Sequence, residues 1–175
     1  MDRHVALIGF MGAGKSSVGR RLAPELGLPF VDTDDAIVAE HGPIPALFER
    51  IGEDGFRAHE LAAVRAALDA PCAVLALGGG AVTHEPTRRV LAERALRVFL
   101  DVPLDVLVAR LQRSNASRPM LGDAPTEARM LALYESRLPL YREADIVVDC
   151  SRRTSSAVAR QVAELVRAHR PLPAA

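Results

Sequence analysis

The sequence predicts an α/β fold in which helices cover a parallel sheet. Short apolar runs alternate with longer segments of helical periodicity, which is the pattern of repeated strand–helix–strand units. A glycine-rich turn typical of phosphate binding follows the first apolar run. A length of 175 residues, with 49% hydrophobic and 25% charged residues, suits one soluble globular domain. We expect this domain to span residues 1–170, with a frayed tail at 171–175.

Five compact apolar runs are short enough to be strands and are apolar enough to be buried on both faces. The strands are therefore predicted, in chain order, at His4–Ile8, Pro29–Val31, Ala73–Leu77, Arg97–Leu100 and Ile146–Val148.

Longer periodic segments between these runs predict the helices, and several carry start or stop signals. Gly27 follows the first helix, Pro103 opens the sixth and Thr126 precedes the seventh. The helices are predicted at Lys15–Leu26, Thr33–Glu40, Ile44–Ile51, Asp54–Leu68, Glu85–Glu93, Pro103–Gln112, Thr126–Tyr141 and Ser155–Arg167.

The segment at 113–125 is polar, is interrupted by glycine and proline, and carries Arg113 and Arg118. Its composition fits a mobile lid over a ligand, and it equally fits a solvated connection between two helices.

Charge and cysteine content exclude several classes of protein. The 22 basic residues balance 22 acidic ones, so no global field would attract nucleic acid or anionic lipid. Cys72 and Cys150 form neither a disulfide framework nor a C-x-x-C metal site. The N-terminal apolar run is too short for a signal peptide, and no run has transmembrane length, so a cytoplasmic location is expected.

The phosphate loop, Gly9 to Ser16, matches G-x-x-x-x-G-K-[ST] between a predicted strand and a predicted helix. Glycines let the backbone curl so that its N–H groups face phosphate oxygens at a helix N-terminus. Lys15 is expected to reach the β- and γ-phosphates of a nucleotide, and Ser16 to ligate Mg²⁺. Lys15 is also the chain's only lysine, which suggests that a compact ammonium is needed there. The alternative is a glycine-rich turn with a chance lysine.

Carboxylates follow two of the predicted strands. Asp32 and Asp34 come at the carboxyl end of the second strand, where open α/β sheets bind ligands. In extended chain they would project to the same side, one toward Mg²⁺ and one toward an acceptor hydroxyl. The alternative is that Asp32 or Thr33 caps the next helix. Asp101 ends the fourth strand and is a second candidate for Mg²⁺, and spacing does not choose between Asp32 and Asp101.

Arginines and glycines later in the chain have functional and ordinary interpretations. Arg57 and Glu60 share a helix face and fit either a site or a surface ion pair. The glycine triplet, Gly78 to Gly80, follows the third strand and allows either close ligand approach or a loose turn. Arg137 begins the segment to Tyr141 that ends a predicted helix, where an arginine also complements the helix dipole.

Together these segments resemble the shikimate kinase family, from Gly9 to about Arg153. The matching motifs are, in order, Gly-Phe-Met-Gly-Ala-Gly-Lys-Ser, Asp-Thr-Asp, Gly-Glu-Asp-Gly-Phe-Arg, Gly-Gly-Gly-Ala-Val, Arg-Pro-Met-Leu and Arg-Leu-Pro-Leu-Tyr. The resemblance implies a P-loop kinase of the nucleoside-monophosphate-kinase type. Such an enzyme phosphorylates the 3-hydroxyl of shikimate with ATP and Mg²⁺, on the route to chorismate and aromatic amino acids.

The resemblance also implies roles for individual residues. Acceptor binding would fall to Asp34, Arg57, Arg137 and the glycine triplet (Gly78, Gly79 and Gly80), with both arginines on the shikimate carboxylate. Nucleotide binding would fall to Gly12, Ala13, Gly14, Lys15, Ser16, Ser17, the lid residue Arg118 and the adenine-side residue Arg153. Lys15, Asp34 and Arg118 would be catalytic, and Ser16 with Asp32 would hold magnesium, so the resemblance favours Asp32 over Asp101.

Two other functions share the phosphate loop. A related gluconate or nucleotide kinase would need a different acceptor site, and a non-catalytic nucleotide-binding domain should lack some magnesium, lid or acceptor residues. We expect ATP and shikimate as the only partners of a monomer that binds neither nucleic acid nor membrane.

Overall fold

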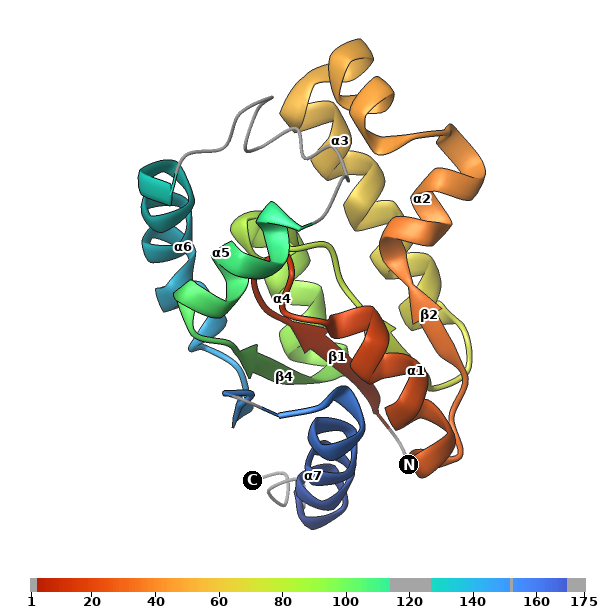
Figure 1. Ribbon diagram of the computed structural model, residues 1–175. Helices are drawn as coiled ribbons and strands as arrows, with labels where there is room; N and C mark the ends of the chain where they lie inside the picture. The colour runs from red at the N-terminus through yellow and green to blue at the C-terminus, as the bar shows by residue number, and fades with distance from the viewer. Residues whose placement is uncertain (1–2, 114–126, 152, 170–175) are drawn as a thin grey trace.

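The computed structural model describes residues 3–113, 127–151 and 153–169. Within these ranges a sheet of five parallel strands has the order β2-β3-β1-β4-β5 (Figure 1). The strands are β1 (His4–Ile8), β2 (Phe30–Asp32), β3 (Val74–Ala76), β4 (Ala95–Asp101) and β5 (Ile146–Asp149). The predicted fold class and all five predicted strands are confirmed, with ends that differ by at most two residues.

The helices also lie close to their predicted positions. They are α1 (Lys15–Leu26), α2 (Thr33–His41), α3 (Ile44–Asp69), α4 (Glu85–Arg94), α5 (Leu104–Gln112), α6 (Glu127–Tyr141) and α7 (Ser155–Ala168), with a 3₁₀ turn η1 (Ala81–Thr83). The two helices predicted from 44 to 68 form the single element α3, which is broken at Gly52 by non-helical backbone with φ 70° and ψ −176°. Only glycine adopts such a conformation readily. The break therefore lies at Gly52, in the gap between the two predicted helices.

The strand order decides which helices share a face of the sheet. The crossover from β1 through α1 to β2 runs in the opposite direction from that of β3 through α4 to β4. Because such crossovers are right-handed, α1 and α4 lie on opposite faces. α7 packs beside α1, and α3 and α6 pack near α4 and η1 on the other face (Figure 1).

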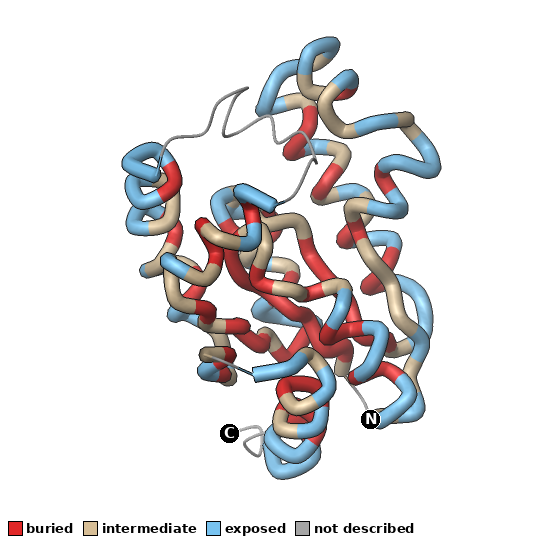
Figure 2. The backbone as a smooth tube through the Cα atoms, in the orientation of Figure 1, coloured by how far each residue is buried: buried red, intermediate tan, exposed pale blue. Residues whose placement is uncertain are grey.

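Burial is greatest at the centre of the sheet. Every residue of β1 and β3 is buried, whereas the three residues of edge strand β2 are only partly buried (Figure 2). α2 and α3 enclose a smaller core of their own around Ile37, Leu47 and Phe56. Since all strands are parallel, their carboxyl ends meet at one edge, where a ligand site is expected. No helix in the described ranges is long and apolar enough to cross a membrane.

Candidate active site

The phosphate loop joins the central strand β1 to α1, as predicted. Gly12 and Gly14 have φ of 80° and 90°, a region that residues with a Cβ rarely adopt, so the glycines are needed for the curl. The Lys15 ammonium folds back over the loop and donates hydrogen bonds to the carbonyls of Gly9 at 2.9 Å and Phe10 at 3.0 Å. Lys15 is 9% exposed, so its charge is held against the loop instead of extending into solvent.

A cavity of about 290 Å³ opens beside this loop. It is lined by Gly12, Ala13, Gly14, Ser17, Val18, Arg110, Cys150, Arg153, Ser155 and Val158. Five residues predicted to bind the nucleotide therefore lie around one space. Arg153 also donates a hydrogen bond to Gln161 of α7.

Arg110, on α5, was missed from the sequence. Its guanidinium donates a hydrogen bond of 3.0 Å to the carbonyl of Gly12 and lines the same cavity. No motif surrounds it, and only the packing of α5 beside the loop reveals its place.

Asp32 lies against Ser16, while Asp101 has a different neighbour. The Ser16 hydroxyl donates to Asp32 Oδ2 at 2.6 Å, and Asp32 Oδ1 accepts the Asp34 N–H at 3.1 Å as the N-cap of α2. The capping role and the contact with Ser16 therefore coexist, one on each carboxylate oxygen. Asp101 instead accepts a long hydrogen bond of 3.5 Å from Tyr134.

Asp34 reaches the site by a different route from the one expected. The sequence argument placed Asp32 and Asp34 on one side of an extended chain, but α2 begins at Thr33, so Asp34 lies in a helical turn and that argument is wrong. The Asp34 side chain nevertheless points at the glycine triplet, because a Cβ on Gly78 would lie 2.8 Å from Asp34 Oδ1. Burial raises the pKa of the Asp34 carboxyl, and the nearby charge of Lys15 opposes this shift.

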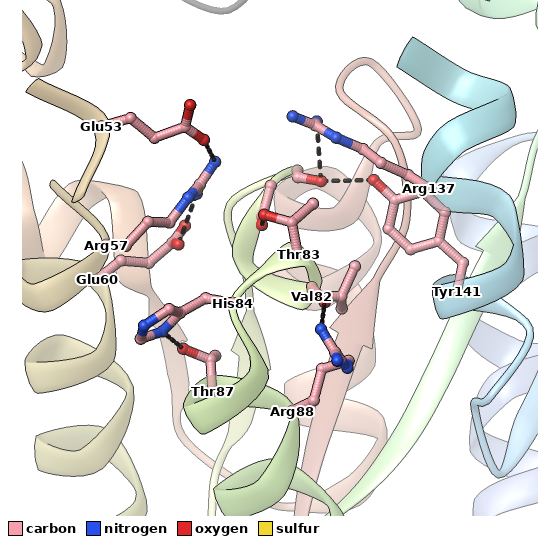
Figure 3. Close-up of polar contacts among 12 residues, drawn as sticks. Glu53, Arg57, Glu60, Val82, Thr83, His84, Thr87, Arg88, Arg137 and Tyr141 are labelled. Carbon is pink, nitrogen blue, oxygen red and sulfur yellow. Dashed lines mark hydrogen bonds and ion pairs between the residues drawn. The ribbon is translucent and has the colours of Figure 1, made fainter. Parts of the chain in front are cut away.

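The glycine triplet is a held backbone and not a loose turn. Its first carbonyl accepts the Ala81 N–H at 3.1 Å, and its third accepts the Thr83 N–H and hydroxyl at 2.9 and 2.7 Å. Its second carbonyl accepts the Tyr141 hydroxyl (Figure 3). Across the described ranges, none of its three amide N–H groups donates a hydrogen bond. The triplet thus presents free donors beside the phosphate loop, since a Cβ on Gly79 would lie only 3.0 Å from the amide nitrogen of Met11.

Arg57 and Glu60 form a buried ion pair, so the surface alternative is wrong. Arg57 Nη1 donates to Glu60 Oε2 at 2.7 Å, and the two side chains are 7% and 1% exposed. The other terminal nitrogen donates at 3.1 Å to Glu53, which is half exposed (Figure 3). Glu60 was not predicted as a site residue, because its three-residue spacing from Arg57 does not show that this face of α3 is buried. Burial raises the pKa of the Glu60 carboxyl against the opposing charge of Arg57.

Arg137 lies across the triplet from Arg57 (Figure 3). It is 2% exposed, its Nη1 is a long 3.4 Å from the Gly79 carbonyl, and its guanidinium is 6.0 Å from the centre of the Phe10 ring in the phosphate loop. Within the described structure, Arg57 Nε and Arg137 Nε are buried donors without a partner. Buried donors are rarely left unpaired, so these two nitrogens favour a ligand that supplies acceptor oxygens here.

The structure therefore brings most predicted site residues together at one sheet edge. Arg118 and the rest of the predicted lid at 114–125 lie outside the described residues. The remaining arrangement can hold a nucleotide phosphate chain at the loop and an anionic, hydroxyl-bearing molecule at the triplet.

A family model, curated sequences and solved structures all match this chain to shikimate kinases. The shikimate kinase family model matches residues 11–167. The chain is 46% identical over 148 residues to the shikimate kinase of Rhodopseudomonas palustris, covering 84% of this chain and 72% of that one. It is 44% identical over 165 residues to the shikimate kinase of Halorhodospira halophila, covering 93% of each. Among solved structures, shikimate kinase from Acinetobacter baumannii in complex with shikimate matches with a TM-score of 0.90 and 36% identity, covering 95% of this chain and 93% of that one.

Proposed function

The chain belongs to the shikimate kinase family, and from this premise we propose which of its residues transfer the γ-phosphoryl group of ATP to the 3-hydroxyl of shikimate. The family assignment makes the chain an ATP-dependent phosphotransferase of the pathway to chorismate and the aromatic amino acids.

One observation carries the acceptor site, namely the two buried arginines on either side of the glycine triplet. Among the described residues each has an Nε without a hydrogen-bond partner, and each keeps its charge at any physiological pH. The carboxylate of shikimate supplies acceptor oxygens to both forks. The free N–H groups of the triplet, with Asp34 beside them, then bind the ring hydroxyls.

The transfer itself needs positioning more than covalent chemistry. In a loose, in-line transition state the negative charge spreads over the γ-phosphoryl oxygens, and donors held in place lower the barrier. Lys15 provides one such donor, exchanging its hydrogen bonds to the loop carbonyls for phosphate oxygens. Asp34 orients the 3-hydroxyl and accepts its proton, and Arg118 adds a second positive charge from the lid.

The residues present fit a magnesium ion. The Ser16 hydroxyl and the Asp32 carboxylate already lie 2.6 Å apart, and hard oxygen ligands of this kind are those that Mg²⁺ prefers. When bound, Mg²⁺ neutralises charge on the β- and γ-phosphates. Ser16 and Asp32 would hold it, and Asp101 is the weaker candidate because its contact is with Tyr134.

The cavity beside the loop is the proposed adenosine site. Arg110 and Arg153 provide flat guanidinium groups at its wall, which can stack on a purine ring. Both substrates then bind to one chain, so the proposed active unit is a monomer. Its location is proposed to be the cytoplasm, where ATP is available, without nucleic acid or membrane partners.

The test is release of ADP with MgATP and shikimate, gluconate, quinate or AMP as parallel acceptors. Activity with shikimate and little with gluconate or AMP is expected, because only a ring acid with vicinal hydroxyls satisfies both arginines and the triplet. Quinate is also such an acid, so its rate relative to that of shikimate measures how strict the acceptor preference is. Activity confined to gluconate or AMP would overturn the acceptor assignment. Absence of turnover with every acceptor, despite MgATP binding, would favour the non-catalytic alternative.

A further inference from the structure

Tyr141 is a buried side chain for which the proposed chemistry has no use. It ends α6, is 1% exposed, and stacks on Phe99 of β4 with ring centres 5.2 Å apart and planes at 15°. Apolar packing alone would be met equally well by phenylalanine. Packing therefore does not explain why this residue carries a hydroxyl group.

The Tyr141 hydroxyl donates to the carbonyl of Gly79, the middle peptide of the glycine triplet (Figure 3). Arg137, one helical turn earlier on α6, has its Nη1 3.4 Å from the same oxygen. Two donors thus approach one carbonyl, and the tyrosine takes the closer position. The arginine keeps only a long contact there, and its buried Nε has no partner in the described structure.

We propose that Tyr141 is a positioning residue for the acceptor site. Its hydroxyl fixes the peptide between Gly79 and Gly80 so that the Gly80 N–H, on the side opposite the held carbonyl, faces shikimate. It also occupies the carbonyl that would otherwise draw Arg137 away from the substrate carboxylate. This inference rests on the proposed function and adds a residue that touches neither substrate.

The surroundings of Tyr141 support the role of a permanent donor. Burial raises its pKa to about 12, so the hydroxyl keeps its proton throughout the range in which an enzyme works. The peptide that it holds begins at Gly79, which lies close to the phosphate loop, because an added Cβ there would be only 3.0 Å from the amide nitrogen of Met11. A small rotation of this peptide therefore changes the acceptor site directly.

The test is the Tyr141→Phe variant, which keeps the stacked ring and removes the hydroxyl. We expect the KM for shikimate, and its dissociation constant by calorimetry, to rise about tenfold, the loss of roughly one well-placed hydrogen bond. The KM for ATP and kcat should stay within about twofold of the wild type, because Lys15 and Asp34 are untouched.

Tyr134→Phe is the matched control, since the chain has only two tyrosines and both lie on α6. Its hydroxyl contacts Asp101 and not the triplet, so its KM for shikimate should not change. Arg137→Lys is a second variant to combine with Tyr141→Phe. In the Arg137→Lys background, Tyr141→Phe should raise the KM for shikimate much less than it does in the wild type, because both changes act on one carboxylate contact.

An unchanged KM for shikimate in Tyr141→Phe would overturn the inference while leaving the proposed function intact. An equal rise in the KM for shikimate and the KM for ATP, together with a large fall in melting temperature, would also overturn it, because this result would mark Tyr141 as a purely structural residue. Failure of the wild-type protein to phosphorylate shikimate would instead remove the proposed function on which the inference rests.

Discussion

Gly80 offers the sharpest test of the acceptor site, because one methyl group there would collide with the guanidinium of Arg57, which is proposed to bind the shikimate carboxylate. The residue has φ −99° and ψ −5°, a conformation open to any amino acid, so Gly80→Ala adds no backbone strain. A Cβ would, however, lie 2.8 Å from Arg57 Nη1 and 2.9 Å from Cζ, and closer still to Nη2. Contacts between carbon and other heavy atoms are favourable only near 3.5–4.0 Å, so the guanidinium must shift by about 1 Å.

The size of the effect follows from what Arg57 does. A displacement of this size misaligns a charged, bidentate contact with the shikimate carboxylate, which is worth about 2 kcal/mol, or roughly 30-fold in binding. We therefore expect Gly80→Ala to raise the KM for shikimate by about that factor, with the KM for ATP unchanged. Steady-state kinetics with each substrate varied in turn measures both constants.

Gly27→Ala is the matched control. Gly27 has φ 66° at the end of α1 and no atom within 4 Å of an added Cβ, so alanine there costs about 1 kcal/mol of stability without touching the site. Its melting temperature should fall while its KM for shikimate stays normal. A Gly80→Ala protein with the wild-type KM for shikimate would refute the assignment of Arg57 to the carboxylate.

Three other expectations concern ionisable groups. An amine-directed reagent should modify Lys15, the only lysine, and MgATP should protect it, as mass spectrometry of the labelled peptide will show. Hydrogen bonds from Arg97 hold the pKa of Asp145 below its ordinary value in spite of burial, so the pair stabilises the fold above pH ~4 and less as the pH falls through the folded pKa. Asp145→Asn should therefore lower the melting temperature at neutral pH and little at acidic pH. In Tyr134→Phe, the remaining Tyr141 should ionise near pH 12, as its pKa is raised to about 12 by burial, and a phenolate absorbance titration that rises two units lower would contradict this.

The fold was predictable because its strands are unusually simple. β1 and β3 are buried on both faces, so continuous apolar runs at His4–Ile8 and Ala73–Leu77 were sufficient to locate them. The phosphate loop was predictable for a different reason, since its spacing is dictated by the shape of a phosphate. Elements that depend on local chemistry alone can be found from one sequence.

Residues that depend on packing were harder to predict. Glu60 fitted a surface pair as well as a buried one, and Arg110 had no motif at all, because burial and proximity arise only when α3 and α5 take their places. The extended-chain argument for Asp34 failed because the cap at Asp32 starts a helix immediately. The glycine triplet was singled out from the sequence, but its tightest steric constraint comes from neighbouring side chains and not from backbone conformation.

The partial burial of β2 has a consequence for local opening of the sheet. This edge strand has three residues and, in the described part of the chain, pairs with β3 alone. It ends at Asp32, the proposed magnesium carboxylate. Short, partly buried edges open more often than central strands, so amide hydrogens of β2 and the start of α2 should exchange faster than those of β1. Ser16 and Asp32 are already hydrogen-bonded at 2.6 Å, and both would hold the magnesium ion when MgATP binds. That binding would slow the exchange, so the least protected strand would gain the most protection from the nucleotide.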